Sequence, residues 1–134
     1  MARKIFVNLP VSHLGASVEF FTKLGFEFNP QFTDETATCM IVNDDAAVML
    51  LVKDRFQDFT KKTICDATSQ TEAILCLSAD SREEVDSLVK TALAEGAKPA
   101  NDAMDEGFMY GWSFQDLDGH LWEVIHMDES AVSQ

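Results

Sequence analysis

The chain of 134 residues is long enough for one compact domain with a buried core, and 46% of it is hydrophobic. No apolar run approaches the roughly 18 residues of a membrane span, and the apolar run near Met1 is too short for a signal peptide, so we expect no membrane association. The three cysteines are odd in number and lack a Cys-x-x-Cys spacing, which indicates a cytoplasmic protein with free thiols.

The net charge of −13 is carried mainly by the second half of the chain. Residues 1–66 hold nine acidic and seven basic side chains, whereas residues 67–134 hold fourteen acidic and three basic ones. A field of this sign repels a polyanion, so the composition excludes nucleic acid as a partner. We interpret the acidity as a contribution to solubility.

The first half of the chain predicts a strand, a helix and three further strands. Residues 4–10 alternate as a strand, and the helix that follows is capped by Ser12 and terminated by Gly25, with apolar residues at helical spacing between them. Three strands are expected next, at residues 26–32, 36–42 and 46–52.

Residues 53–71 interrupt this pattern. They mix Phe56 and Phe59 with four of the ten cationic side chains of the chain. One interpretation is a solvated linker, with a short helix, whose two aromatic side chains are tucked into the core. The other is a mobile cationic flap over an anionic ligand. We favour the linker, because connecting segments commonly vary and move without binding anything.

The second half repeats the first. A strand at residues 72–79 precedes a capping box formed by Ser81 and Glu84, and the helix ends at Gly96. Three strands follow, at residues 98–103, 108–115 and 120–127, the last two joined by a turn with the hairpin signal Asp118-Gly119. A shift of 71 residues superimposes the two helix patterns, so the chain predicts a duplicated βαβββ unit. The expected boundaries within one domain, residues 1–134, are module 1 at 1–53, a linker at 54–71, module 2 at 72–128 and a tail at 129–134.

Two βαβββ modules that close with Asp116-Leu117-Asp118-Gly119 and Glu123 resemble the vicinal oxygen chelate superfamily. This is the group of glyoxalase I, bleomycin-resistance proteins and extradiol dioxygenases. The resemblance covers nearly the whole chain and is closest to the bacterial glyoxalase-like proteins called predicted lactoylglutathione lyases, although Leu117 stands where many relatives have proline. It implies an α+β fold in which the modules form a curved mixed sheet around a cleft, lined by the first and fourth strands of each module.

The resemblance also implies where metal-dependent members place their ligands, one on each of these four strands. Counted from the strand–helix junctions, the positions fall on Phe6, Leu50, Ile74 and Glu123. Of these four side chains only the Glu123 carboxylate is a metal ligand, so we expect no metal and no other cofactor. The strand around Glu123 is otherwise apolar on both faces, where an ionised carboxylate requires a partner.

Alternation along the strands predicts the lining of the cleft. The residues that we assign to ligand binding are Phe6, Asn8, Leu50, Val52, Ile74, Cys76, Trp112 and Glu123. The alternative is a cleft filled by its own large side chains, with nothing bound.

Three functions follow from this pattern. The first is a metal-free binder of a small apolar or aromatic molecule in the cleft between the modules, as bleomycin-resistance relatives sequester their drug. The second is a metal-independent isomerase or lyase in which Glu123 is the catalytic general base. The third, which the residues argue against, is a metal-dependent glyoxalase or dioxygenase. The partners that we expect are a small-molecule ligand and a second copy in a homodimer, because open sheets leave edge strands to cover.

Overall fold

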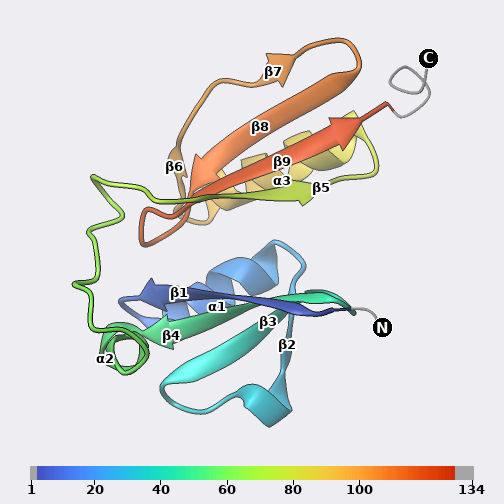
Figure 1. Cartoon of the computed structure of the whole chain (residues 1–134). Helices are drawn as coiled ribbons and strands as arrows, with labels where there is room; N and C mark the ends of the chain where they lie inside the picture. Colours follow the sequence, from blue (N-terminus) through green and yellow to red (C-terminus); the bar gives the residue numbers. More distant parts are fainter. Residues whose placement is uncertain (1–2, 129–134) are drawn as a thin grey trace. The chain divides into compact units, whose positions relative to one another are not determined.

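A computed structural model of the protein describes residues 3–128, so the predicted tail at 129–134 lies outside the described residues. The chain divides into two compact units, Met1–Cys65 and Asp66–Gln134. Each unit pairs one mixed β-sheet with a helix, which gives the α+β class that the sequence predicts (Figure 1). No helix among the described residues is both long and apolar enough to span a bilayer.

The first unit contains one four-stranded sheet, in the order β1-β4-β3-β2, with β1 parallel to β4. Its elements are β1 (Ile5–Val11), α1 (Leu14–Lys23), β2 (Glu27–Asn29), the 3-10 helix η1 (Pro30–Phe32), β3 (Ala37–Asn43), β4 (Ala46–Val52) and α2 (Lys53–Gln57).

The second unit repeats this arrangement, with the order β5-β9-β8-β6 and with β7 also paired to β8. Its elements are β5 (Ile74–Ser78), α3 (Arg82–Ala94), β6 (Lys98–Pro99), β7 (Met104–Asp105), β8 (Met109–Gln115) and β9 (Leu121–Met127). In both units the first and last strands are parallel neighbours, followed by the strand before the last and then by the second. The predicted duplication is therefore confirmed at the level of sheet topology.

One predicted strand is interrupted. Residues 98–103 were expected to be continuous, but β6 ends at Pro99 and pairing with β8 resumes only at Met104. Between them, the backbone N–H of Asn101 donates to the Ser113 hydroxyl at 2.9 Å. A side-chain acceptor thus replaces a ladder bond at this point, which the local sequence does not reveal.

Local sequence signals set the ends of the two long helices. Gly25 and Gly96 follow α1 and α3 with φ values of 101° and 112°, a region that favours glycine. The Ser81 hydroxyl accepts a hydrogen bond from the Glu84 backbone N–H at 3.1 Å, as a capping residue should. The prediction that Ser12 is the cap of α1 is wrong, because the N-cap is His13, without a side-chain cap.

The segment after β4 is part helix and part turn. Phe59 is 66% exposed, so the prediction that both aromatic side chains of this segment enter the core is wrong for Phe59. The Arg55 guanidinium lies 4.7 Å from the Phe59 ring centroid and pairs with Asp58 at 3.0 Å. The Gln57 side-chain amide donates to the backbone oxygens of Thr60 and Lys62, and this local bonding gives the turn its shape.

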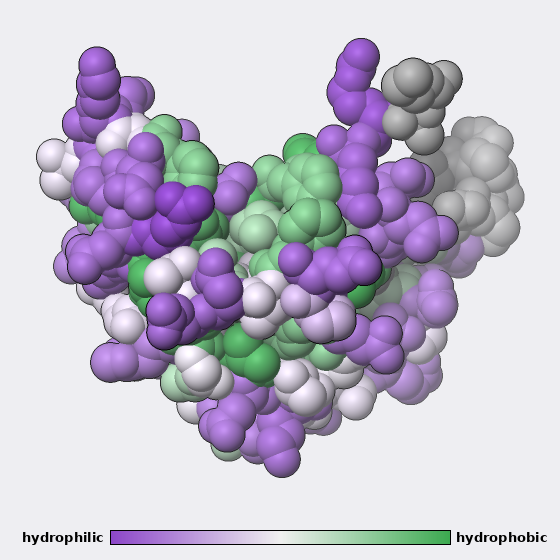
Figure 2. All heavy atoms as spheres, turned by 90° about the horizontal axis from the view of Figure 1, so that it is seen from below, coloured by the Kyte–Doolittle hydropathy of each residue, from purple (hydrophilic) through white to green (hydrophobic). Residues whose placement is uncertain are grey.

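Each unit has a well-packed core and also exposes apolar side chains. The fully buried large residues include Phe21, Met40 and Leu50 in the first unit and Phe114 and Trp122 in the second. In the view of Figure 2, hydrophobic side chains reach the surface among hydrophilic ones. The exposed apolar residues include Ile5, Phe6, Ile41 and Phe59 in the first unit and Ile74, Met104, Phe108 and Met127 in the second.

Candidate functional site

The second sheet has one face that α3 covers and one that it does not. Tyr110 of β8 donates a hydrogen bond to Asp86 of α3, so Tyr110 lies on the covered face. Side chains alternate along a strand, and residues paired across neighbouring strands point to the same side. Ser113 is three residues after Tyr110 on β8, so its side chain points to the other side of the sheet. Glu123 pairs with Ser113 and therefore lies on that side as well. We call this side the open face.

Three cross-strand rows make up the centre of the open face. The central row is Cys76, Glu123 and Ser113, on β5, β9 and β8. The flanking rows are Ile74, Leu121 and Gln115 on one side, and Ser78, Ile125, Gly111 and Met104 on the other. The predicted ligand residues Ile74, Cys76 and Glu123 thus share one face of one sheet. Ile74 is 55% exposed there, so its side chain is available for contact.

The Glu123 carboxylate is half-buried in the central row. No group among the described residues of its own unit donates a hydrogen bond to it. Its in-register neighbour is the Cys76 thiol, whose pKa is raised by burial and by the negative charge of Glu123. Cys76 therefore remains a protonated thiol at neutral pH rather than a thiolate nucleophile. This arrangement offers a ligand one charged acceptor beside apolar surface.

The register of the first sheet corrects two predicted site residues. Phe6 pairs with Ala47 and Asn8 with Met49, so these four side chains share a face. Leu50 and Val52 pair instead with Leu9 and Val11, and Leu9, Val11 and Leu50 are buried. Leu50 and Val52 therefore lie on the opposite face from Phe6 and Asn8. β4 is apolar at every position, so its sequence has no alternation that would assign its faces.

Phe6 and Asn8 themselves are accessible. Phe6 is 48% exposed, and the Lys4 ammonium lies 5.5 Å from its ring centroid. Asn8 is also exposed, and its amide donates a long hydrogen bond, 3.4 Å, to the Phe6 backbone oxygen. The predicted cleft between the two modules stays a prediction, as does ligand binding by these two residues.

Trp112 is a third correction. It pairs with Val124, which is fully buried, and it lies two residues from Tyr110 on the same strand. Alternation therefore places Trp112 on the side that α3 covers and not with Glu123. Its indole is half-buried and belongs to the packing of α3 on the sheet.

The turn that precedes Glu123 is organised by a buried carboxylate. Asp116 accepts hydrogen bonds from the backbone N–H groups of Asp118 and His120 and from the indole N–H of Trp122, the last at 2.9 Å. Burial raises the pKa of Asp116, while the nearby His120 and these donors act in the opposite direction. Gly119 has a φ of 90°, and a β-carbon there would lie 2.7 Å from the Ala67 oxygen. The Asp-x-Asp-Gly sequence thus forms the turn before β9 and is hydrogen-bonded to Trp122 in that strand.

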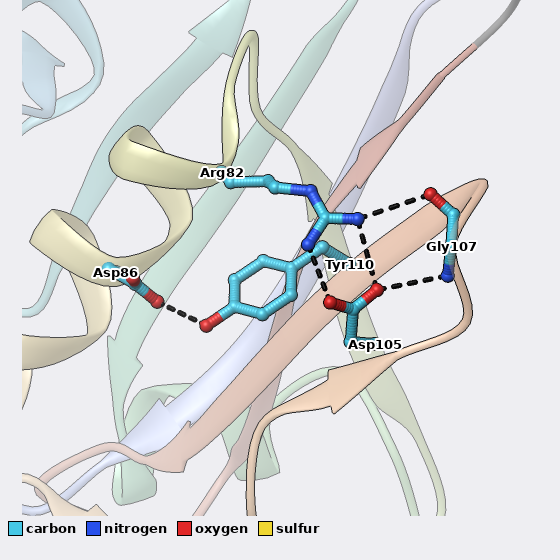
Figure 3. A network of polar contacts seen from close by, with 5 residues as sticks. All are labelled: Arg82, Asp86, Asp105, Gly107 and Tyr110. Atoms are coloured by element: carbon cyan, nitrogen blue, oxygen red, sulfur yellow. Dashed lines mark hydrogen bonds and ion pairs between the residues drawn. The ribbon is translucent and has the colours of Figure 1, made fainter.

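A polar cluster that sequence reasoning missed lies on the α3 side of the same unit (Figure 3). The Arg82 guanidinium makes a two-pronged contact with the Asp105 carboxylate at 2.7 and 3.0 Å and donates to the Gly107 oxygen at 3.1 Å. The guanidinium carbon of Arg82 lies 5.1 Å from the centroid of the Tyr110 ring, and the Tyr110 hydroxyl donates a hydrogen bond to the Asp86 carboxylate at 2.5 Å. No local pattern signals these pairs, because the partners are separated by more than twenty positions.

The chain is similar in sequence and in fold to known proteins. Residues 3–43 match the family model of the bleomycin resistance protein-like N-terminal region. A Staphylococcus aureus structure, hypothetical protein SA1046, is 28% identical and superimposes with a TM-score of 0.79 over 94% of this chain and 95% of its own. No match is found among curated proteins. The chain therefore has the fold of glyoxalase/bleomycin resistance/dioxygenase structures, and its residues 3–43 are similar to the bleomycin-resistance family.

Two further structures have the same fold at lower identity. A glyoxalase/bleomycin resistance protein/dioxygenase family enzyme from Burkholderia phytofirmans is 16% identical, with a TM-score of 0.77 over 94% of this chain and 99% of its own. The fosfomycin resistance protein FosX from Listeria monocytogenes is also 16% identical, with a TM-score of 0.69 over 94% and 93%. At these identities the likeness concerns the fold.

The residues at the ligand positions that the resemblance implies do not suit a metal ion. In the second sheet the two positions are Ile74 and Glu123, and Glu123 lies in register with Cys76, two residues after Ile74. In the first sheet, the residue two positions after Phe6 is Asn8, and Asn8 lies in register with Met49. By this relation, the position that the resemblance placed on Leu50 falls on Met49.

With Met49 in place of Leu50, the four positions still offer too few atoms that bind a metal ion. Hydrocarbon side chains occupy two of the positions, a thioether the third and one carboxylate the fourth, whereas a stable site for Zn²⁺ or a similar ion has at least three protein ligands. No group of three or more His, Cys, Asp or Glu side chains capable of holding a metal occurs among residues 3–128.

Proposed function

We propose that this protein is a member of the vicinal oxygen chelate superfamily and that it binds a small molecule with an apolar or aromatic body on the open face of its second sheet, without a metal ion. The observation that carries the proposal is the row centred on Glu123. The Glu123 carboxylate, to which none of the described residues of its unit donates a hydrogen bond, lies beside exposed Ile74 and between two rows that contain Leu121 and Ile125. Small-molecule sites commonly combine such apolar surface with a few polar groups.

The chemistry of the row favours binding over covalent catalysis. Cys76 is a nucleophile in register with Glu123, but burial and the adjacent negative charge keep its thiol protonated. The Glu123 carboxylate is instead suited to accept a hydrogen bond from an N–H or O–H group of the ligand. FosX and the bleomycin-resistance family are named for resistance to small-molecule drugs, which supports a ligand of this size.

A thermal-shift screen tests the proposal. The probes are bleomycin, fosfomycin and a panel of neutral aromatic compounds, and each compound that stabilises the protein is then titrated against variants. Replacing Glu123 by Gln removes a charge-assisted hydrogen bond, and we expect affinity to fall about 10-fold or more. Ile74→Ala should weaken binding through lost apolar contact. The control is Leu117→Ala, because Leu117 is exposed on the turn and not on the open face.

The screen has clear adverse outcomes. A stabilising compound whose affinity is unchanged by both Glu123→Gln and Ile74→Ala binds elsewhere and contradicts the proposed site. Saturable binding that requires added metal and disappears with chelator contradicts the metal-free part.

A second candidate function rests on the same carboxylate. Because no group of its own unit described by the structure donates to Glu123, the carboxylate is able to take a proton from a bound carbon acid, as the general base of an isomerase or lyase. Turnover of a bound compound by the wild type that Glu123→Gln abolishes, with the compound still bound, would favour this enzyme over the binder.

A further inference from the structure

A short segment of the second unit crosses the edge of the sheet between β6 and β8. We call residues 100–108 the strap. It contains β7, whose two residues pair with β8, Met104 with Gly111 and Asp105 with Tyr110. Adjacent strand residues point to opposite sides. Met104 therefore lies on the open face, in the row of Gly111 and Ile125, while Asp105 lies on the side of α3.

The strap is held from the α3 side. Arg82, the first residue of α3, donates two hydrogen bonds to the Asp105 carboxylate and one to the Gly107 backbone oxygen (Figure 3). The Gly107 N–H donates back to Asp105 at 2.9 Å, which closes a small ring of contacts. Tyr110 lies against the guanidinium and is anchored to Asp86. These contacts hold Asp105, and because Met104 is its immediate neighbour they also restrict the backbone at Met104.

The open face beside Met104 is apolar. Its neighbour on β8 is Gly111, which has no side chain, and a β-carbon there would lie 3.1 Å from the Ile125 Cγ2 atom. Ile125 therefore occupies the space above Gly111, and Met104 lies on the other side of the same row. Met104 is 50% exposed, so its flexible, polarisable thioether is free to contact a ligand that lies over Ile125.

We propose that the strap is one wall of the ligand site, with Met104 as a specificity-determining contact and with Arg82 and Asp105 as positioning residues. The inference rests on the proposed function, because it assigns a wall to that same open face. Binding energy is lost when a contact residue must be ordered at the moment of binding. The ion pair holds the backbone of the strap beside Met104 in place beforehand and so reduces the backbone part of that cost.

The test uses the neutral fluorophore N-phenyl-1-naphthylamine as the probe, with the full chain. Met104→Ala should weaken probe binding by about 3- to 10-fold, and Met104→Leu, which keeps the apolar volume, should restore most of it. Arg82→Gln should weaken binding by about threefold, since it loosens Met104 without removing it. Hydrogen exchange at the amides of Glu106 and Gly107 should become faster in Arg82→Gln, because the strap opens more often.

The matched control is Arg55→Gln. It breaks the Arg55–Asp58 pair of the first unit, which is about as exposed as the Arg82–Asp105 pair. Exchange in the strap and probe affinity should both remain at wild-type values in this variant. Unchanged affinity in Met104→Ala, or faster strap exchange without weaker binding in Arg82→Gln, overturns the inference.

The outcome for Ile74→Ala separates this inference from the proposed function. If Ile74→Ala weakens the probe but Met104→Ala does not, the open face binds and the strap is not its wall. If neither variant weakens it, or the probe does not bind saturably, both proposals fail.

Discussion

Gly119→Ala tests whether the turn before β9 depends on close backbone packing. Gly119 has a φ of 90°, and a β-carbon there would lie 2.7 Å from the Ala67 oxygen and 2.9 Å from the Ala67 carbonyl carbon and the Thr68 Cα. The left-handed conformation alone costs a non-glycine residue about 1–2 kcal/mol. The contact is with backbone, which cannot rotate away as a side chain can, and forced displacement of packed groups adds about 1–3 kcal/mol. We expect a total loss of roughly 2–5 kcal/mol in the free energy of unfolding.

Gly107→Ala is the matched control for this change. Gly107 has a φ of 83° in the same unit, but a β-carbon at this position would meet no atom within 4 Å. It should therefore lose only the conformational part, about 1–2 kcal/mol. Urea denaturation followed by tryptophan fluorescence suits the comparison, because both tryptophans of the chain, Trp112 and Trp122, lie in the second unit. Equal destabilisation by the two substitutions would refute the argument from contact with Ala67.

Four other outcomes are expected. Trp122→Phe should cost roughly 1.5–3 kcal/mol of unfolding free energy, because the buried Asp116 loses the indole N–H, and Trp112→Phe should cost less; an equal loss in urea titrations would contradict this. Arg82 and the Gly107 N–H lower the pKa of Asp105 to about 2, so the stability that this carboxylate contributes is present above pH 3.8 and is lost as pH falls towards 2. The difference in stability between the wild type and Asp105→Asn should shrink across that range, and a constant difference would rule out the linkage. Dialysed protein should contain less than stoichiometric metal and form no lactoylglutathione in added Ni²⁺ or Zn²⁺, and activity abolished by chelator would show the contrary. Light scattering at micromolar concentration should give a homodimer, because β1 and β2 in the first sheet and β5 and β6 in the second are edge strands; a monomer would count against it.

The features that the sequence predicted correctly are local in origin. Gly25 and Gly96 end their helices because each needs only its own backbone conformation and the preceding turn. Ser81 caps α3 through a residue three positions away. The absence of metal-ligating atoms at Phe6 and Ile74 is a matter of residue type, which no fold changes. The repeat could be predicted from the sequence because both halves contain the same local signals in the same order.

The features that required the tertiary structure are relations between distant strands. β4 is apolar throughout, so only its register with β1 shows that Met49, and not Leu50, shares a face with Asn8. The sequence predicts Trp112 as a site residue, but its pairing with buried Val124 places it on the α3 side. Arg82 meets Asp105 across 23 positions because α3 and β7 flank the same strand. Side-chain direction alternates at every residue, so one step of register decides which side chains a ligand can reach, and register is fixed by pairing rather than by composition.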